Sequence, residues 1–299
     1  MPFVQANVNY ATQYAQDLAN AYPYLSYFGA LYGGANSAKY RPIMGKTVAI
    51  PSLEVSGAVA ADRDNLTGAF TRNWNNAWQT VTCEQDREWS TLIDPLDIVQ
   101  TNDIATIANV TKTFNEQQKI PEMDAYAAST LGSAAITATK ADAVTLTSAN
   151  ILAQWDTYLS SMTDGRVNRD RVIAYMTPAT YKLLKEAAGI TRFIDSGTGI
   201  RNVDRNVGKL DGVTIVEVPS DLMMSAYDFT TGFVADANAV QINLLLVDPE
   251  AVAAPVIYDT AMIGAPTAQS KGKYLYYERF YYDCFLLDNR HAGIWCNHA

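Results

Sequence analysis

The sequence predicts an α+β fold in which a long hairpin and a long helix accompany an α/β region. Three observations support this class. Residues 47–55 and 74–82 alternate between apolar and polar side chains, which is the period-two pattern of strands. Residues from about 102 to 131 carry apolar side chains at helical spacing. Between residues 172 and 247, short apolar strand patterns alternate with a helical segment.

Composition places the chain among folded globular proteins. Hydrophobic residues make up 48% of its 299 residues, which excludes an intrinsically disordered chain because such chains are poor in apolar side chains. The formal net charge of −9 argues against a dedicated nucleic-acid binder with clustered lysine and arginine. Charged residues make up only 18%, below the roughly 25% that is usual for soluble domains. Either the core is therefore large, or other molecules cover much of the surface.

The sequence carries no signal of export or membrane insertion. Its three widely spaced cysteines, Cys83, Cys284 and Cys296, do not form a disulfide framework, so we expect a reducing compartment. The first five residues contain neither a basic region nor an apolar one, and we expect no signal peptide. The longest apolar runs, such as residues 244–247, are too short to cross a bilayer. These features predict a soluble cytoplasmic product.

Catalytic and metal-binding motifs are missing from the sequence. Its two histidines, His291 and His298, lie too near the C-terminus for an HExxH motif, a zinc finger or the usual Ser-His-Asp order. Cys284 and Cys296 lie beside them, but structural zinc sites favour CxxC-type spacing, and a small core residue is the better interpretation of Cys284. Residues 196–199 begin like a GxGxxG motif that lacks its third glycine. We predict no catalytic residue, no cofactor and no metal, and a protein that is not an enzyme.

The first 42 residues are rich in tyrosine, asparagine and alanine and contain one acidic residue, Asp17. Tyr10, Tyr14 and Leu18 recur at intervals of four residues, which places them on one side of a short predicted helix. This stripe packs either into the core of the same chain or against a neighbouring molecule. A segment this irregular packs poorly alone, which favours the neighbour.

Residues 47–55 and 74–82 are the predicted strands of one long hairpin, joined by a polar, turn-rich stretch. Trp74 and Trp78 share one face of the second strand. Because an isolated two-stranded hairpin is only marginally stable in water, these tryptophans need something to pack against. They belong either to an ordinary core strand or to a contact between molecules, and the pattern leaves both interpretations open.

A long helix is predicted from about residue 102 to 131. Thr101 or Asn102 can cap its N-terminus, with Asp103 in the first turn, where an acidic side chain interacts favourably with the helix dipole. Pro121 either ends or kinks this helix or begins a second helical turn. At 1.5 Å per residue the whole element spans roughly 40 Å, longer than an ordinary globular helix.

The following segment alternates strand and helix signals. Residues 134–147 are small and threonine-rich and are expected to form a loop or strand, and a shorter helix begins near residue 151. A strand over 172–176 precedes a helix that Thr177 caps and Pro178 begins. A polar loop over 195–211 and further strands at 213–218, at 242–247 and from 256 follow.

The last strong signal is a strand over residues 274–287. Its even-numbered side chains face one way and its odd-numbered side chains the other, and both sets are largely apolar or aromatic. We therefore predict that this strand is central in its sheet or covered on both faces.

Three stretches of the chain, taken together and in this order, are typical of one protein family. They are IPEMDAY at 120–126, RVIAYMTPATYKLL at 171–184 and FYYDCFLLDNRHAGI at 280–294. Together with the arm, hairpin and long helix, the chain resembles the major capsid proteins of tailed double-stranded-DNA bacteriophages, which have the Hong Kong 97-type fold. The resemblance covers nearly the whole chain, and no single stretch would be sufficient.

The resemblance implies a Hong Kong 97-like capsid fold with an N-arm, an E-loop hairpin, a P-domain with a long spine helix, and an A-domain. The implied boundaries are 1–42 for the N-arm, 43–90 for the E-loop, 91–165 with a spine helix at about 102–131 for the first part of the P-domain, 166–251 for the A-domain, and 252–299 for the closing strands of the P-domain.

The resemblance also implies the partners. The chain would form the pentamers and hexamers of an icosahedral shell, with a portal protein and separate scaffolding or decoration proteins as further partners. The shell would enclose DNA without sequence-specific binding and would involve no membrane. It would be assembled in the bacterial host cytoplasm and would be part of the virion. The implied inter-subunit contact candidates are Tyr10 and Tyr14 in the arm, Trp74 and Trp78 in the hairpin, and Arg201 and Arg205 in the loop that would point toward the five- or six-fold axis.

The sequence departs from the family pattern in two places. No lysine lies between Lys46 and Lys112, so the predicted E-loop has no lysine for an isopeptide cross-link between subunits. No long charged helical segment precedes the arm, so a fused scaffolding domain is not expected. Two other classes stay open: an encapsulin-type protein nanocompartment, which shares the fold and encloses protein cargo, and an ordinary α/β enzyme.

Overall fold

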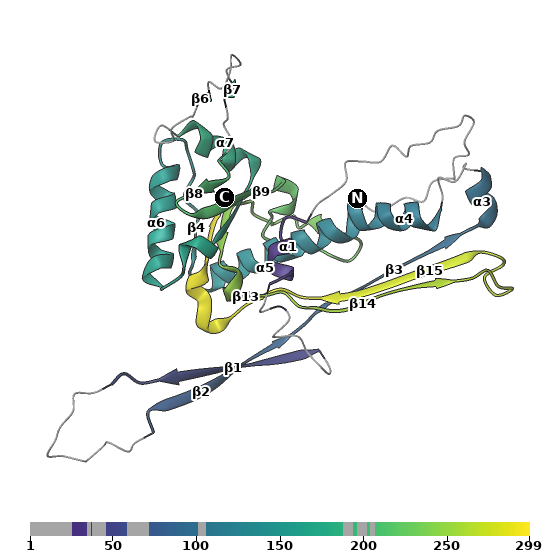
Figure 1. Cartoon of the computed structure of the whole chain (residues 1–299), viewed down its shortest axis with the longest axis horizontal. Coiled ribbons are helices and arrows are strands. Elements are labelled where there is room, and N and C mark those ends of the chain that lie inside the picture. Colours follow the sequence, from purple (N-terminus) through teal and green to yellow (C-terminus); the bar gives the residue numbers. More distant parts are fainter. Residues whose placement is uncertain are drawn as a thin grey trace.

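The computed structural model describes residues 26–34, 37, 46–58, 72–100, 106–187, 194–195, 202–203 and 207–299. These residues form a body of helices and strands with two extensions (Figure 1). One extension is a two-stranded hairpin, and the other is a three-stranded sheet with a long helix along it. The predicted mixture of helices and strands is confirmed.

The described helices are α1 (Gly29–Tyr32), α3 (Pro95–Gln100), α4 (Ile107–Phe114), α5 (Ile120–Thr137), α6 (Ile151–Asp164) and α7 (Pro178–Glu186). A π-helix, η1 (Asn115–Lys119), joins α4 to α5, and short 3-10 turns lie at η2 (Arg169–Arg171), η4 (Ser220–Leu222), η5 (Pro249–Ala251) and η6 (Asp288–Gly293). Across these described segments, none of the helices is both long and apolar enough to span a membrane.

The described strands are β1 (Thr47–Val55), β2 (Trp74–Thr82), β3 (Gln85–Ile93), β4 (Ala141–Asp142), β5 (Ile173–Met176), β6 (Ile194–Asp195), β7 (Asn202–Val203), β8 (Lys209–Leu210), β9 (Val213–Glu217), β10 (Tyr227–Asp228), β11 (Val234–Ala235), β12 (Ile242–Val247), β13 (Val252–Ala253), β14 (Val256–Gly264), β15 (Tyr274–Tyr282), β16 (Phe285–Leu286) and β17 (Ile294–His298). The bounds of β1 and β2 agree with the predicted hairpin strands.

The body is built on a six-stranded sheet with the order β4-β17-β12-β5-β9-β8. In its middle, β12 pairs antiparallel with β17 and β5, while β5 with β9 and β17 with β4 are parallel pairs. Residues 244–247 of β12 are all buried, as expected for a strand that is covered on both faces. The sheet contains the strands predicted at 172–176, 213–218 and 242–247.

Helices cover both faces of this sheet. On one face α1 and α5 pack against Leu245, and the Phe28 ring stacks on Tyr175 with 4.1 Å between ring centroids. On the other face α6 and α7 pack against Leu244, with Trp155 among the buried residues. Because successive side chains of a strand point to opposite faces, β12 contributes to both cores.

Local capping chemistry positions α7 as the sequence predicts. The backbone of Thr177 is extended, and its hydroxyl oxygen accepts a hydrogen bond from the Thr180 amide (3.4 Å). Pro178 occupies the first turn, where proline costs little because its missing amide hydrogen has no helical partner there.

The long helix begins and ends later than predicted. Its N-cap is Thr106, whose hydroxyl oxygen accepts a hydrogen bond from the Asn109 amide (3.3 Å), whereas the predicted caps Thr101 and Asn102 lie outside the described residues. At the other end, residues 134–137 were expected to be loop or strand but continue α5. Alanine has the highest helix propensity, and Ala135 is fully buried against the sheet, so burial extends the helix beyond its predicted end.

Pro121 does not end the long helix. It lies in the first turn of α5, directly after the π-helix Asn115–Lys119. A π-helix accommodates one extra residue within a continuous helix, and proline is tolerated in the turn that follows. From Ile107 to Thr137 the element is about 45 Å long at 1.5 Å per residue.

The three-stranded sheet has the order β14-β15-β3, with antiparallel pairing throughout. β15 is central, as predicted, but its two faces differ along most of its length. Tyr276, Glu278 and Phe280 are buried on the side of the long helix, whereas Leu275 and Arg279 on the opposite side are exposed. Of the two predicted alternatives, the central strand is the one that the structure shows, while over this half of the strand the long helix covers one face only.

The predicted strand 274–287 is interrupted at Asp283. Its carboxylate accepts hydrogen bonds from the amides of Cys284 (2.6 Å) and Glu84 (3.0 Å), which ends the ladder with β3. The chain then continues as β16, which pairs with β13 instead.

A buried carboxylate ties the N-terminal described segment to the long helix. Asp124 of α5 accepts hydrogen bonds from the Ser26 hydroxyl (3.0 Å) and from the amides of Tyr27 (2.7 Å) and Phe28 (3.3 Å). The amides at the start of α1 thereby gain an acceptor from another element, and α1 is fixed against the core.

Close backbone packing at Gly293 gives a test of this architecture. A Cβ at Gly293 would lie 2.5 Å from the Cβ of Ala251 and 3.4 Å from that of Asp248, and neither atom is the flexible end of a side chain. We expect Gly293→Ala to lower the free energy of unfolding by about 2 kcal/mol, measured by chemical denaturation. Gly208→Ala is the matched control, since its added Cβ meets nothing within 4 Å. Equal effects of the two substitutions would contradict the packing explanation.

Candidate assembly surface

The base of the β1–β2 hairpin is bound to the body by a small apolar cluster. Val48 and Ile50 of β1 are buried together with Cys83, Tyr281 and Leu287. The Tyr281 hydroxyl donates a hydrogen bond to the carbonyl oxygen of Cys83 (2.5 Å). The cluster joins the hairpin to β15 and to the segment after β16, so the root of the hairpin is fixed.

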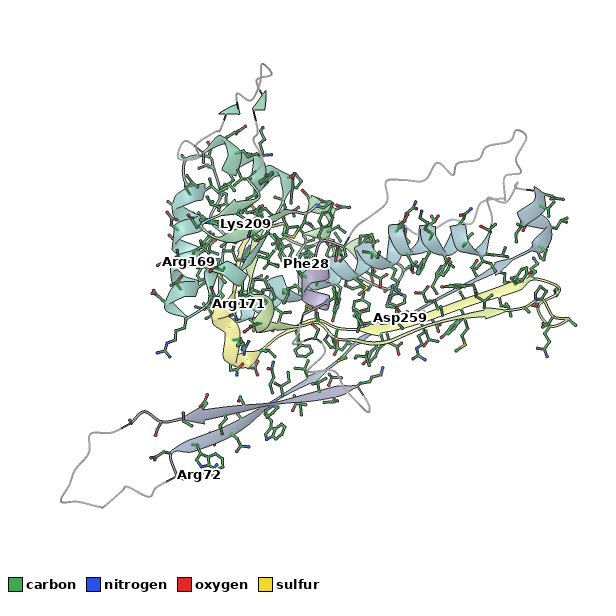
Figure 2. All side chains as sticks on the ribbon, in the orientation of Figure 1. Phe28, Arg72, Arg169, Arg171, Lys209 and Asp259 are labelled. Carbon is green, nitrogen blue, oxygen red and sulfur yellow. The ribbon has the colours of Figure 1, made fainter. Side chains whose placement is uncertain are left out.

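The outer half of the hairpin presents large apolar side chains to solvent. Leu53, Val55, Trp74 and Trp78 are 68%, 72%, 51% and 61% exposed. At the outer end of β2, the Arg72 guanidinium lies 4.2 Å from the centre of the Trp74 ring, and its Nε donates to the Trp74 carbonyl oxygen at 3.0 Å (Figure 2). This exposure removes the interpretation of the two tryptophans as core residues of their own chain.

A second group of exposed apolar side chains lies at one end of the three-stranded sheet and on α3. We call it the distal patch, and it consists of Leu92, Leu96, Val99, Met262, Ile263 and Leu275. Leu92, Leu275 and Met262 share the face of the sheet opposite the long helix, whereas Ile263 lies on the other face. The sequence did not predict this patch, although its apolar residues flank two turn signals, Asp94-Pro95 and the stretch after Gly264.

A buried ion pair holds the long helix on the three-stranded sheet. Arg87 of β3 binds the Glu122 carboxylate of α5 through Nε (2.6 Å) and Nη2 (3.1 Å). The same guanidinium donates to the carbonyl oxygens of Phe229 and Gly232. Glu122 is buried, so loss of Arg87 would leave an unpaired carboxylate in the interior, which is strongly destabilising.

A second ion pair lies one helical turn away. Lys119 Nζ is 2.5 Å from Glu278 Oε1 and 3.1 Å from Asp259 Oδ2, and it lies 4.7 Å from the centre of the Phe280 ring. The Tyr276 hydroxyl donates to the other oxygen of Glu278 (2.8 Å). Figure 2 shows Asp259 on the sheet beside the long helix. Together with Arg87, these contacts fix the rotation and the axial position of the helix on the sheet.

The three cysteines are buried and free. Burial raises the pKa of Cys83 to about 11 and that of Cys296 to about 12, so both thiols stay protonated at neutral pH. Cys284 is a fully buried core residue, as its sequence context indicates. Within the ranges that the structure describes, no group of three or more His, Cys, Asp and Glu side chains is placed to hold a metal ion.

The structure describes two of the six predicted contact residues. Trp74 and Trp78 lie on the exposed outer half of β2, and their contact with a neighbour stays a prediction. The other four, Tyr10, Tyr14, Arg201 and Arg205, lie outside the described residues.

Comparison with known proteins identifies the fold. No protein-family model matches the chain, and no curated protein matches it by sequence. Among solved structures, a chain from the asymmetric unit of the bacteriophage PhiM1 mature capsid is 14% identical, with a TM-score of 0.69 over 97% of this chain and 92% of that chain.

Two further solved structures agree. A chain from the capsid structure of the cyanophage P-SCSP1u is 14% identical, with a TM-score of 0.63 over 97% of this chain and 92% of that chain. A chain from Mycobacterium phage Che8 is 15% identical, with a TM-score of 0.58 over 98% of each chain. The chain therefore has the fold found in these phage capsid structures, over nearly its whole length.

Asp283 makes the stability of the fold depend on pH. Besides the two amides, its carboxylate accepts a hydrogen bond from the Tyr126 hydroxyl (2.8 Å), yet burial is the larger effect and raises its pKa. A carboxyl group whose pKa is higher in the folded than in the unfolded protein stabilises the fold below the unfolded pKa. This contribution is lost as the pH rises through the folded pKa.

We expect Asp283→Asn to remove this pH dependence. The free energy of unfolding of the wild type, relative to the variant, should be greatest below about pH 3.8 and fall as the pH rises, becoming constant once Asp283 is ionised. Chemical denaturation at a series of pH values measures this difference. Glu54→Gln on the exposed hairpin is the control, and a difference between wild type and Asp283→Asn that is the same at every pH would contradict the expectation.

Proposed function

We propose that this chain is the major capsid protein of a tailed double-stranded-DNA bacteriophage, which self-assembles into the icosahedral shell around the genome. The shared fold with phage capsid structures over 97% of the chain supports this proposal. The observation that carries it is the hairpin, whose outer half extends beyond the body with Trp74 and Trp78 exposed. A second copy of the chain is the surface that would bury them.

In this proposal the parts of the chain take the roles of the Hong Kong 97-type architecture. The proposed roles are N-arm for 1–42, E-loop for 43–90, P-domain for 91–165 and 252–299, and A-domain for 166–251. The long helix Ile107–Thr137 would be the spine helix. The pairing of β3 with β15 supports one change to these bounds, in which the E-loop ends at Thr82 instead of residue 90 and β3 belongs to the P-domain.

Burial of apolar surface supplies the driving force for assembly. Full burial of one leucine or valine side chain contributes about 1.5–3 kcal/mol. Each hairpin exposes Leu53 and Val55 as well as two tryptophans, so one hairpin contact contributes on the order of several kcal/mol before the costs of association. Each copy would both insert a hairpin and receive one, and such head-to-tail contacts close into rings.

The proposed role is structural, and the net charge supports it. A net charge of −9 per chain is consistent with a wall that encloses packaged DNA without binding it tightly, because tight binding needs clustered cations against the phosphates. The proposed partners are further copies in pentamers and hexamers, a portal protein, and separate scaffolding or decoration proteins. We infer assembly in the host cytoplasm and a final location in the virion.

An encapsulin-type nanocompartment is the second candidate. The solved structures reported above come from phages, which favours the phage shell. The content of purified particles distinguishes the two, since a phage head encloses DNA and a nanocompartment encloses protein.

The double substitution Trp74→Ser with Trp78→Ser tests the proposed assembly surface. Both rings are exposed in the single chain, so the free energy of unfolding should change by less than about 1 kcal/mol. Loss of two buried anchors should raise the protein concentration needed for assembly by at least about tenfold. Light scattering and negative-stain microscopy measure assembly, and chemical denaturation measures stability.

Trp89→Ser is the matched control for a tryptophan that supports the fold. Trp89 stacks on Phe114 with 4.0 Å between centroids and meets Tyr276 edge-on, so its loss should destabilise the monomer by about 3 kcal/mol. A wild-type protein that remains monomeric at every concentration would refute the capsid proposal. Lower monomer stability in the double variant would show that Trp74 and Trp78 support their own fold instead.

A further inference from the structure

The hairpin leaves the body at a well-defined point. Along β2 the residues from Trp74 to Trp78 are exposed, and Gln79 is the first residue from the outer end that is partly buried. Its partner across the ribbon, Ile50, is the last buried residue of β1. The Ile50–Gln79 pair therefore separates the anchored half of the hairpin from the outer half.

Gln79 holds the body with both ends of its side-chain amide. Its Nε2 donates a hydrogen bond to the Leu286 carbonyl oxygen (3.0 Å), and its Oε1 accepts one from the Asp288 amide (3.0 Å). Asp288 begins η6, and the N-cap residue Leu287 offers no side-chain acceptor to that turn. Gln79 thus supplies, from another strand, the acceptor that a first helical amide needs.

The apolar contacts and the hydrogen bonds at the base of the hairpin have different effects on its position. The apolar cluster around Val48 and Ile50 holds the hairpin on the body, but apolar burial has little directional preference. Hydrogen bonds depend steeply on angle, and two of them to one planar amide define a direction. Gln79 is the residue at this boundary that supplies that direction.

Small rotations at this boundary produce large displacements. Five residue pairs lie beyond it, from Pro51 with Trp78 to Val55 with Trp74, and at about 3.4 Å per residue they extend about 17 Å. A rotation of about 10° at Gln79 then moves the Trp74 end by about 3 Å, which is enough to break a packed contact.

We propose that Gln79 is a positioning residue. The two hydrogen bonds of its side-chain amide, one donated and one accepted, set the direction in which the hairpin leaves the body. By doing so they determine where Trp74 and Trp78 meet a second copy of the chain. The second part of this inference rests on the proposed function, whereas the first part concerns the single chain. The two parts are therefore tested separately.

The direction of the hairpin is measured in the monomer with the variant Gln79→Met, which keeps the length of the side chain and removes both hydrogen bonds. Spin labels at Glu54→Cys on the hairpin and Ser160→Cys on α6 report the distance between hairpin and body by pulsed electron paramagnetic resonance. The native thiols are buried and protonated, so they do not compete for the label.

We expect the distance distribution to become about twofold wider in Gln79→Met and hydrogen exchange at the Asp288 amide to become about tenfold faster. Ser52→Ala is the matched control, because the Ser52 hydroxyl bonds Ala77 within the hairpin itself. The control should leave both readouts unchanged. An unchanged distribution in Gln79→Met would overturn the proposal, even if its stability were reduced.

Gln79→Glu is the second variant, since it keeps the acceptor for Asp288 and loses the donor to Leu286. It should give an intermediate width, and it replaces Gln79→Met if that variant does not fold. In assembly, we expect Gln79→Met to form particles with a broader range of diameters than Ser52→Ala. Identical particles from both variants would refute the second part. Failure of the wild type to assemble would refute the proposed function, while the distance measurement would still decide the first part.

Discussion

Helix α5 packs against two different sheets at once, and the arrangement of the rest of the chain follows from this double burial. Toward its C-terminal end, Leu131 and Ala135 lie in the core of the six-stranded sheet. At Gly132 the helix approaches β12 so closely that an added Cβ would lie 2.5 Å from Ile242 Cδ1. Toward its N-terminal end, Glu122 binds the three-stranded sheet through Arg87. One rigid element therefore fixes the body and the sheet extension relative to each other.

The junction between α5 and its neighbours is unusually rich in buried carboxylates. Glu122, Asp124, Glu278 and Asp283 are all buried there, and each has hydrogen-bond donors directed at it. Well-packed apolar residues often stabilise a fold as well as buried ion pairs do, so stability alone does not explain this arrangement. Apolar side chains tolerate sliding of a helix along a sheet, whereas these partners are satisfied at one axial position. The carboxylates thus give the junction a single geometry.

The sequence predicted the regular elements well wherever periodicity reflects burial by near neighbours. The strands at 47–55 and 74–82, the cap at Thr177 and the buried strand at 242–247 are examples. Prediction from the sequence failed where a contact with a distant residue decides where an element ends or which of its faces is buried. The end of β15 at Asp283 and the one-sided burial of β15 depend on contacts between residues far apart in the chain. The start of the long helix is a different case, because its cap, the Thr106 hydroxyl that accepts from the Asn109 amide, is local. The distal patch was missed because apolar residues at strand ends look like core residues until the strands are placed in space.

The three-stranded sheet has a consequence for the newly made chain. In the part of the chain that the structure describes, β14 and β3 each pair with β15 on one side and with no strand on the other. Such edges offer unpaired backbone groups to any passing strand, and over nine residues β14 carries a single charge, Asp259. At high concentration, disordered strand-to-strand aggregation of newly synthesised chains would therefore compete with the proposed ordered assembly. The yield of soluble protein would then depend on the relative rates of these two routes as well as on the stability of the monomer.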